Sequence, residues 1–90
     1  MVLTYYNGKE VLDMEIKVLE DSRVLITKNG KNYLIEKDLI GGTMIYNYFV
    51  YEDIYNDLEH FLDTENEDKY FYNEFGNLET AIKDIQNSDN

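Results

Sequence analysis

The sequence predicts an α+β fold, an antiparallel β-sheet meander of four to five strands with two short C-terminal helices packed on one face or end. Three observations support this prediction. Asn7-Gly8 and Asn29-Gly30 each lie between β-rich runs, and Asn-Gly suits a hairpin turn because both central residues need positive φ. Apolar and polar residues alternate from Leu12 to Val18, which is typical of a half-buried strand. After Glu52 the apolar residues recur instead with the period of a helix.

The length and composition indicate one domain. The chain has 90 residues, of which 43% are hydrophobic, and it includes nine tyrosines and four phenylalanines. This is enough apolar material for one core, and the length is that of a single small domain. We therefore expect one compact α+β domain over residues 1–85 and a flexible C-terminal tail over residues 86–90.

Four strands are expected in the first half, over residues 2–6, 12–18, 24–27 and 31–36. The second is the best defined, because its apolar residues occupy every other position. A polar turn over residues 20–23 separates the second strand from the third. Gly41-Gly42 then ends the β pattern.

Residues 43–51 are rich in aromatic and β-branched residues, which favours another strand. Both of its faces are largely apolar, so it is either central with both faces covered, or it presents a tyrosine-rich face to a partner. From Glu52 a helix is expected. Its apolar stripe consists of Ile54, Leu58, Phe61 and Leu62.

The rest of the chain is predicted to hold one more helix. Residues 64–69 are polar and are expected to form a loop, and residues 70–72 form either a short strand or an aromatic plug against the core. Asn77 is expected to cap the final helix. The apolar residues of that helix are Leu78, Ala81, Ile82 and Ile85.

The composition excludes several classes of function. The chain has no cysteine, which excludes a disulfide framework, a thiolate metal site and a cysteine nucleophile. Residues 1–6 lack the basic and apolar regions of a signal peptide, and no apolar run approaches the roughly 18 residues of a membrane span. The net charge of −11 would also be repelled by anionic lipid. We therefore expect a cytoplasmic protein that does not bind membranes.

Negative charge is concentrated in the second half of the chain. Residues 1–40 hold seven acidic and six basic residues, whereas residues 41–90 hold twelve acidic residues against Lys69 and Lys83. Charge of one sign repels itself and does not stabilise the fold, so it indicates a partner with a basic surface. In cells, such surfaces commonly hold nucleic acid.

The carboxylates between residues 52 and 68 are the main candidates for contact with this partner. Asp53/Asp57 and Glu59/Asp63 place like charges four residues apart, which lowers the stability of a helix. Carboxylates along one helix face lie roughly 6–10 Å apart, a spacing comparable to that of phosphates. The alternative is a solvated helix face that keeps a small protein in solution. The predicted partner-binding residues are the carboxylates Glu52, Asp53, Asp57, Glu59, Asp63, Glu65, Glu67 and Asp68 and the tyrosines Tyr51, Tyr55 and Tyr70.

Tyrosines share the acidic half of the chain. They are Tyr46, Tyr48, Tyr51, Tyr55, Tyr70 and Tyr72. Tyrosine is enriched in interface hot spots because it combines a large rigid ring with a polar tip. The alternative places most of these rings in the core, which is favoured for whichever of Tyr46 and Tyr48 faces inward.

Two other kinds of site have weaker support. Asp63, Glu65, Glu67 and Glu74 stand at positions 1, 3, 5 and 12 of an EF-hand count, but Asp68 occupies position 6, where a glycine is required. His60, the only histidine, is accompanied by no nucleophile motif and no phosphate-binding loop. We therefore expect no metal, no cofactor and no enzymatic activity.

In length, acidic half and compact α+β pattern, the chain resembles the small acidic inhibitors that phages and mobile elements encode. These include anti-CRISPR proteins, anti-restriction DNA mimics and inhibitors of DNA-repair glycosylases. No fixed motif carries the resemblance, so no residue role is transferred from it. The resemblance implies an inhibitor in a bacterial cytoplasm that blocks the DNA- or RNA-binding groove of a CRISPR effector, restriction or repair enzyme, without binding nucleic acid itself. The mixed charge of the first half favours a localised acidic face.

Two alternatives remain open. The chain could be a small interaction module, such as an immunity or adaptor protein, that binds a basic protein surface unrelated to nucleic acid. Alternatively, residues 2–36 could form part of an SH3-like barrel whose binding groove contains Tyr5, Tyr6 and Tyr33. The sequence carries no signal for an oligomeric state.

Overall fold

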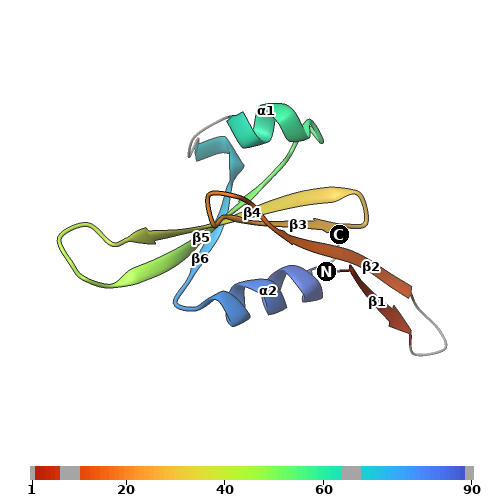
Figure 1. Cartoon of the computed structure of the whole chain (residues 1–90), viewed down its shortest axis with the longest axis horizontal. Coiled ribbons are helices and arrows are strands. Elements are labelled where there is room, and N and C mark those ends of the chain that lie inside the picture. The colour runs from red at the N-terminus through yellow and green to blue at the C-terminus, as the bar shows by residue number, and fades with distance from the viewer. Residues whose placement is uncertain (1, 7–10, 64–67, 89–90) are drawn as a thin grey trace.

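The structure is a computed structural model that describes residues 2–6, 11–63 and 68–88, with side chains from residue 14 onward within these ranges. One six-stranded antiparallel sheet is combined with two α-helices and a short 3-10 helix (Figure 1). The predicted α+β class is confirmed. The strands are β1 (Val2–Tyr6), β2 (Val11–Val18), β3 (Val24–Lys28), β4 (Lys31–Leu39), β5 (Tyr46–Glu52) and β6 (Phe71–Phe75). The helices are α1 (Leu58–Asp63), η1 (Asp68–Tyr70) and α2 (Leu78–Asn87).

The strands follow one another across the sheet in sequence order, from β1 at one edge to β6 at the other. The predicted turn at Asn29-Gly30 is present, since both residues have positive φ, 50° and 84°, between the paired residues Lys28 and Lys31. The Asn7-Gly8 turn lies outside the described residues. The sheet has more strands than expected because residues 71–75 form β6 beside β5.

The sheet has a hydrophobic cluster on each face. One cluster joins buried side chains of β2–β5, including Met14, Ile26 and Tyr33, to Ala81 and Ile85 of α2. The other cluster consists of Leu25, Leu34, Phe61 and Tyr70, so it joins β3 and β4 to α1 and η1. Successive strand side chains point to opposite faces, which is why neighbouring residues enter different clusters.

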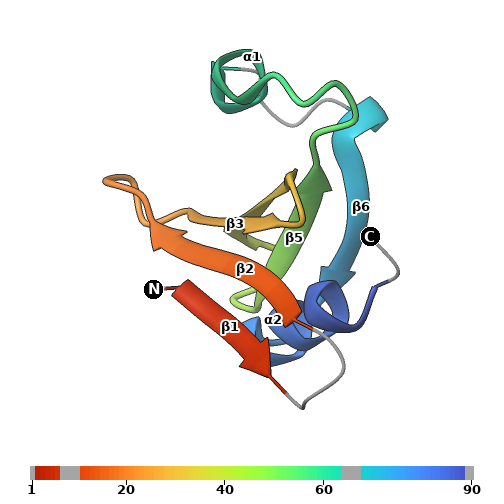
Figure 2. The same ribbon diagram turned by 90° about the vertical axis from the view of Figure 1, so that its right-hand side faces the viewer.

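The two α-helices therefore lie on opposite faces of the sheet, as both views show (Figure 1, Figure 2). The expected packing of both helices on one face or end of the sheet is therefore not what the structure shows. The sequence pattern showed that each helix has an apolar stripe, but not which face of the sheet it covers. Below, the two faces are called the α1 face and the α2 face.

The helix expected from Glu52 begins later, at Leu58. β5 continues to Glu52, and the connection that follows is not helical. The Asp53 carboxylate accepts a hydrogen bond from the Tyr55 backbone N–H at 2.9 Å, and Asn56 has a φ of 57°. Asp and Asn side chains that bond the local backbone compete with helix formation, and a left-handed residue interrupts it.

The aromatic strand expected over residues 43–51 begins at Tyr46. Residues 40–45 form the turn before it, where Gly42 has a φ of 77°. β5 is paired on both sides, with β4 and β6. Val50 is buried on the α2 face, while Tyr51 is half-buried on the α1 face. The strand is therefore central, but its N-terminal end at Tyr46 is exposed.

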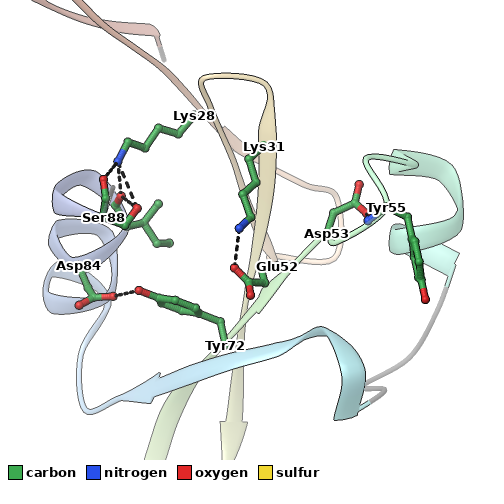
Figure 3. Close-up of polar contacts among 9 residues, drawn as sticks. Lys28, Lys31, Glu52, Asp53, Tyr55, Tyr72, Asp84 and Ser88 are labelled. Carbon is green, nitrogen blue, oxygen red and sulfur yellow. Dashed lines mark hydrogen bonds and ion pairs between the residues drawn. The ribbon is translucent and has the colours of Figure 1, made fainter. Parts of the chain in front are cut away.

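The final helix begins as predicted, because the Asn77 side chain accepts a hydrogen bond from the Thr80 backbone N–H at 2.8 Å. It continues to Asn87, beyond the expected boundary at residue 85. Buried Lys28 of β3 donates to the carbonyl oxygens of Ile85 and Ser88, which ties this end of α2 to the sheet (Figure 3). Among the described residues, neither helix has the length and apolar character needed to cross a membrane.

Candidate acidic docking surface

The register of β4, β5 and β6 brings carboxylates together on the α1 face. Leu34 of β4 enters the cluster under α1, so Glu36 and Asp38 lie on the same face by alternation. Glu36 pairs with Phe49 of β5, and Phe49 pairs with Glu74 of β6. Glu36 and Glu74 therefore flank the Phe49 ring position from its two neighbouring strands.

The sheet fixes the spacing of these charges. Glu36 and Asp38 are two residues apart on one strand, which separates them by about 7 Å, while Glu36 and Glu74 are two strands apart, or about 10 Å. The Asn47 side-chain amide donates to a Glu74 carboxylate oxygen at 3.0 Å, which holds Glu74 in place. Arg23 lies beside Glu36, with its guanidinium 3.7 Å from the Glu36 carboxylate. The charges thus occupy a rigid frame.

Tyr51 lies among these carboxylates. Partial burial raises the pKa of its hydroxyl, and the negative charges of Glu36, Asp38 and Asp68 raise it further. The Tyr51 ring also packs edge-on against Phe71, with ring centroids 5.9 Å apart. Residues from β4 and η1, which are far apart in sequence, therefore share one electrostatic environment around Tyr51.

α1 and Asp57 just before it add three carboxylates on the same side of the sheet. Buried Phe61 anchors the helix, and Asp57, Glu59 and Asp63 are exposed. The Asp57 side chain accepts from the His60 backbone N–H at 3.3 Å and so caps the helix. We call the combined surface the acidic face. It consists of Glu36, Asp38, Phe49, Tyr51, Asp57, Glu59, Asp63, Asp68 and Glu74.

Several predicted contact residues do not belong to the acidic face, and Figure 3 shows two of them, Glu52 and Asp53. Glu52 pairs with Tyr33, whose ring is in the α2-face cluster, and its carboxylate lies 2.9 Å from the Lys31 ammonium. Asp53 is 1% exposed and accepts hydrogen bonds from the Asn32 side-chain amide and the Tyr55 backbone. Its carboxylate shapes the turn after β5 and is not available to a partner.

Tyr70 is also 1% exposed, so it is a core residue and not an anchor for a partner. Its ring packs against Phe61, with centroids 5.4 Å apart, and against Tyr55 at 6.1 Å. Tyr55 itself is exposed, and Lys69 lies over its ring at 5.5 Å. Glu65 and Glu67 lie outside the described residues.

The sequence does not single out Glu36, Asp38 and Glu74, because all three lie outside its continuous acidic stretch over residues 52–68. A usable signal was present in β4, where Leu34, Glu36 and Asp38 alternate on one face of a predicted strand. The position of Glu74 could not be inferred without the β5–β6 register. That register includes an irregularity between Val50 and Tyr51.

The structure also bears on the other candidate sites. Tyr33 is fully buried in the α2-face cluster, so it does not line the binding groove of a barrel. The side chains of Tyr5 and Tyr6 lie outside the described residues. In the part of the chain with described side chains, no group of three or more His, Cys, Asp and Glu residues could hold a metal ion.

A comparison of the chain with protein-family models finds no match, and neither does a comparison with curated proteins or with solved structures. The geometry and charge of the surface itself are therefore the basis for inferring a function.

Proposed function

We propose that this protein is an acidic inhibitor that binds a nucleic-acid-handling enzyme of a bacterial cell and blocks its DNA- or RNA-binding groove. The observation that carries the proposal is the convergence of carboxylates from β4 and η1 near Tyr51, with Glu74 of β6 set beside Phe49 by strand register. Two of these carboxylates, Glu36 and Asp38, come from the half of the chain whose charge is balanced. The fold therefore concentrates negative charge beyond what the sequence alone suggests.

A fixed row of carboxylates offers a basic groove the kind of charge pattern that a phosphate backbone offers. Grooves lined with Lys and Arg attract polyanions by long-range steering, and the same field would attract the acidic face. The separations of about 7 and 10 Å follow from strand geometry, so little order has to be created on binding. Half-buried Phe49 and Tyr51 add ring surface between the charges.

The proposed mechanism is competitive exclusion. The protein acts as a binding partner in the cytoplasm and performs no chemistry of its own, and it needs no cofactor and no membrane. It does not bind nucleic acid, because its acidic face carries the same sign of charge.

The test begins with capture of the target from a nuclease-treated bacterial lysate at low and high salt. The purified target is then incubated with the protein and with excess DNA or RNA. We expect nucleic acid to displace the protein and added salt to weaken the complex. A complex that survives excess nucleic acid would instead indicate an adaptor that binds a basic surface unrelated to nucleic acid.

A charge-reversal variant tests the surface directly. Glu59→Lys, Asp63→Lys and Asp68→Lys together should abolish binding while leaving the circular dichroism spectrum unchanged, because all three side chains are exposed. If this folded triple variant binds as tightly as the wild type, the acidic face is not the contact surface.

A further inference from the structure

We propose that the turn between β4 and β5 carries a second contact, an apolar wedge that enters an apolar pocket beside the basic groove of the same target. We call residues 39–46 the hairpin tip. This inference rests on the proposed function, since the acidic face is what places the partner next to the tip. It goes beyond that function by naming an apolar contact that charge mimicry does not require.

The hairpin tip carries a cluster of exposed apolar side chains. The Met44 side chain is 90% exposed and the Ile45 side chain is 60% exposed. Their neighbours Leu39, Ile40 and Tyr46 are also exposed. The hairpin projects away from the body of the sheet (Figure 1). Single exposed apolar residues are ordinary, but several together at a projecting end are typical of a surface that another molecule covers.

The tip is held in one conformation by its own hydrogen bonds. The Ile40 backbone N–H donates to the Ile45 carbonyl at 2.9 Å, and the Thr43 backbone N–H donates to the Ile40 carbonyl at 3.0 Å. The Thr43 hydroxyl donates to the same carbonyl at 2.8 Å and accepts from the Ile45 backbone N–H at 3.2 Å. Gly42, with a φ of 77°, supplies the left-handed residue of the turn. A wedge that is already ordered loses little conformational entropy on binding.

The tip continues the acidic face. Asp38 pairs with Asn47, and the Ile40–Ile45 hydrogen bond lies two residues further along both strands. Ile40 and Ile45 therefore follow directly beyond Asp38 and Asn47 along the hairpin, and Ile40 is two residues, or about 7 Å, from Asp38. A partner seated on Glu36, Asp38 and Glu74 therefore lies next to the apolar tip.

Charge selects the occupant of this surface. A pocket bordered by Lys or Arg complements the acidic residues next to the tip. A second copy of the chain would bring together two molecules of net charge −11, whose charges repel each other. Anionic lipid is repelled by the same charge. A basic protein with an apolar pocket is therefore the partner that fits.

Site-specific photocrosslinking tests the inference in the bacterial host. A benzophenone amino acid replaces Met44 in one variant, and Lys83, exposed on α2, in the control. We expect the variant at position 44 to crosslink to one other protein, at apolar residues bordered by Lys or Arg. Crosslinks to a second copy of the chain, to lipid, or to nothing beyond the control would each overturn the inference.

Kinetics with the crosslinked protein, once purified, separate the two contacts. Met44→Ser with Ile45→Thr should raise the dissociation rate at least tenfold and leave the association rate unchanged, since no charge is altered. Asp38→Asn with Glu74→Gln should lower the association rate and its salt dependence. Thermal unfolding of both variants should match the wild type, since all four side chains are exposed.

The two proposals fail in different ways. If the tip variant dissociates at the wild-type rate, the wedge is refuted, even where nucleic acid displaces the protein from its target. If nucleic acid leaves the complex intact while the tip variant dissociates faster, the proposed inhibition is refuted and the wedge stands.

Discussion

Replacing Lys28 with Met should lower the free energy of unfolding by about 1.5–3 kcal/mol, the range for a hydrogen bond to a charged group. The Lys28 side chain is 1% exposed, and its ammonium donates to the Ile85 carbonyl at 3.0 Å and to the Ser88 hydroxyl at 3.2 Å (Figure 3). A cation at this end of α2 also interacts favourably with the helix dipole. Methionine has a similar length, so the change removes the charge and the donors without leaving a large cavity.

Urea unfolding and thermal unfolding, followed by circular dichroism, measure this effect. For a domain of this size the expected loss corresponds to a fall of roughly 6–24 °C in Tm. Lys83→Met is the matched control. Lys83 is an exposed residue of α2, the helix whose end Lys28 binds, and its ammonium lies 3.2 Å from the Glu79 carboxylate. It should change the stability by less than about 0.5 kcal/mol. A Lys28→Met variant as stable as the wild type would show that dehydration of the ammonium cancels its hydrogen bonds.

Three further predictions concern local contacts. The hydrogen bond to Asp84 raises the pKa of Tyr72 to about 12, so the stability it provides is present below about pH 10 and is lost as the pH rises to about 12. Tyr72→Phe should remove this pH dependence of the free energy of unfolding in urea. An unchanged pH profile in that variant would contradict the assignment. Asp57→Ala removes the cap of α1 and should cost about 1 kcal/mol with some loss of helical signal; wild-type stability would show that the cap is dispensable. Gly30→Ala forces a residue with a side chain into a φ of 84° and should cost about 1 kcal/mol in thermal unfolding, whereas no change would mean that the turn relaxes.

Local rules predicted several elements of the fold correctly. Asn29-Gly30 forms its hairpin turn because the φ requirement of the turn involves only those two residues. Asn77 caps α2 because capping depends on the next three residues. The strand predicted over residues 31–36 is present and extends to Leu39, and the apolar stripe of α2 follows from its helical periodicity. Each of these elements is determined by residues close together in the sequence, within one turn or one helix or strand.

The failures involve contacts that a local pattern does not contain. The helix predicted from Glu52 starts at Leu58, because the Asp53 side chain bonds the backbone of Tyr55 and Asn56 is left-handed. The sequence predicts Glu52 as a contact residue, but the pairing of β5 with β4 turns its side chain toward Lys31, on the face opposite the acidic face. One position of register reverses the face of a strand residue, so carboxylate counts along the sequence cannot define a surface.

The same limit explains the missing part of the candidate site. Glu36 and Asp38 belong to the half of the chain with balanced charge, and only pairing across β5 brings them near Glu74. Asp68 of η1 joins them because all three carboxylates act on the Tyr51 hydroxyl. The charge of the sequence therefore predicts a candidate acidic surface, and the position and composition of the acidic face follow from the pairing of the strands.

Two glutamates give the most direct test of the proposed docking surface. Glu59 is the second residue of α1 and Glu79 is the second residue of α2, and both side chains are exposed. The two helices lie on opposite faces of the sheet. Reversal to Lys changes the net charge equally in both variants. Affinity for the captured target should fall at least tenfold in Glu59→Lys and stay within about twofold of the wild type in Glu79→Lys. Equal losses in both variants would show that only the overall charge matters, and a loss confined to Glu79→Lys would place the contact on the opposite face.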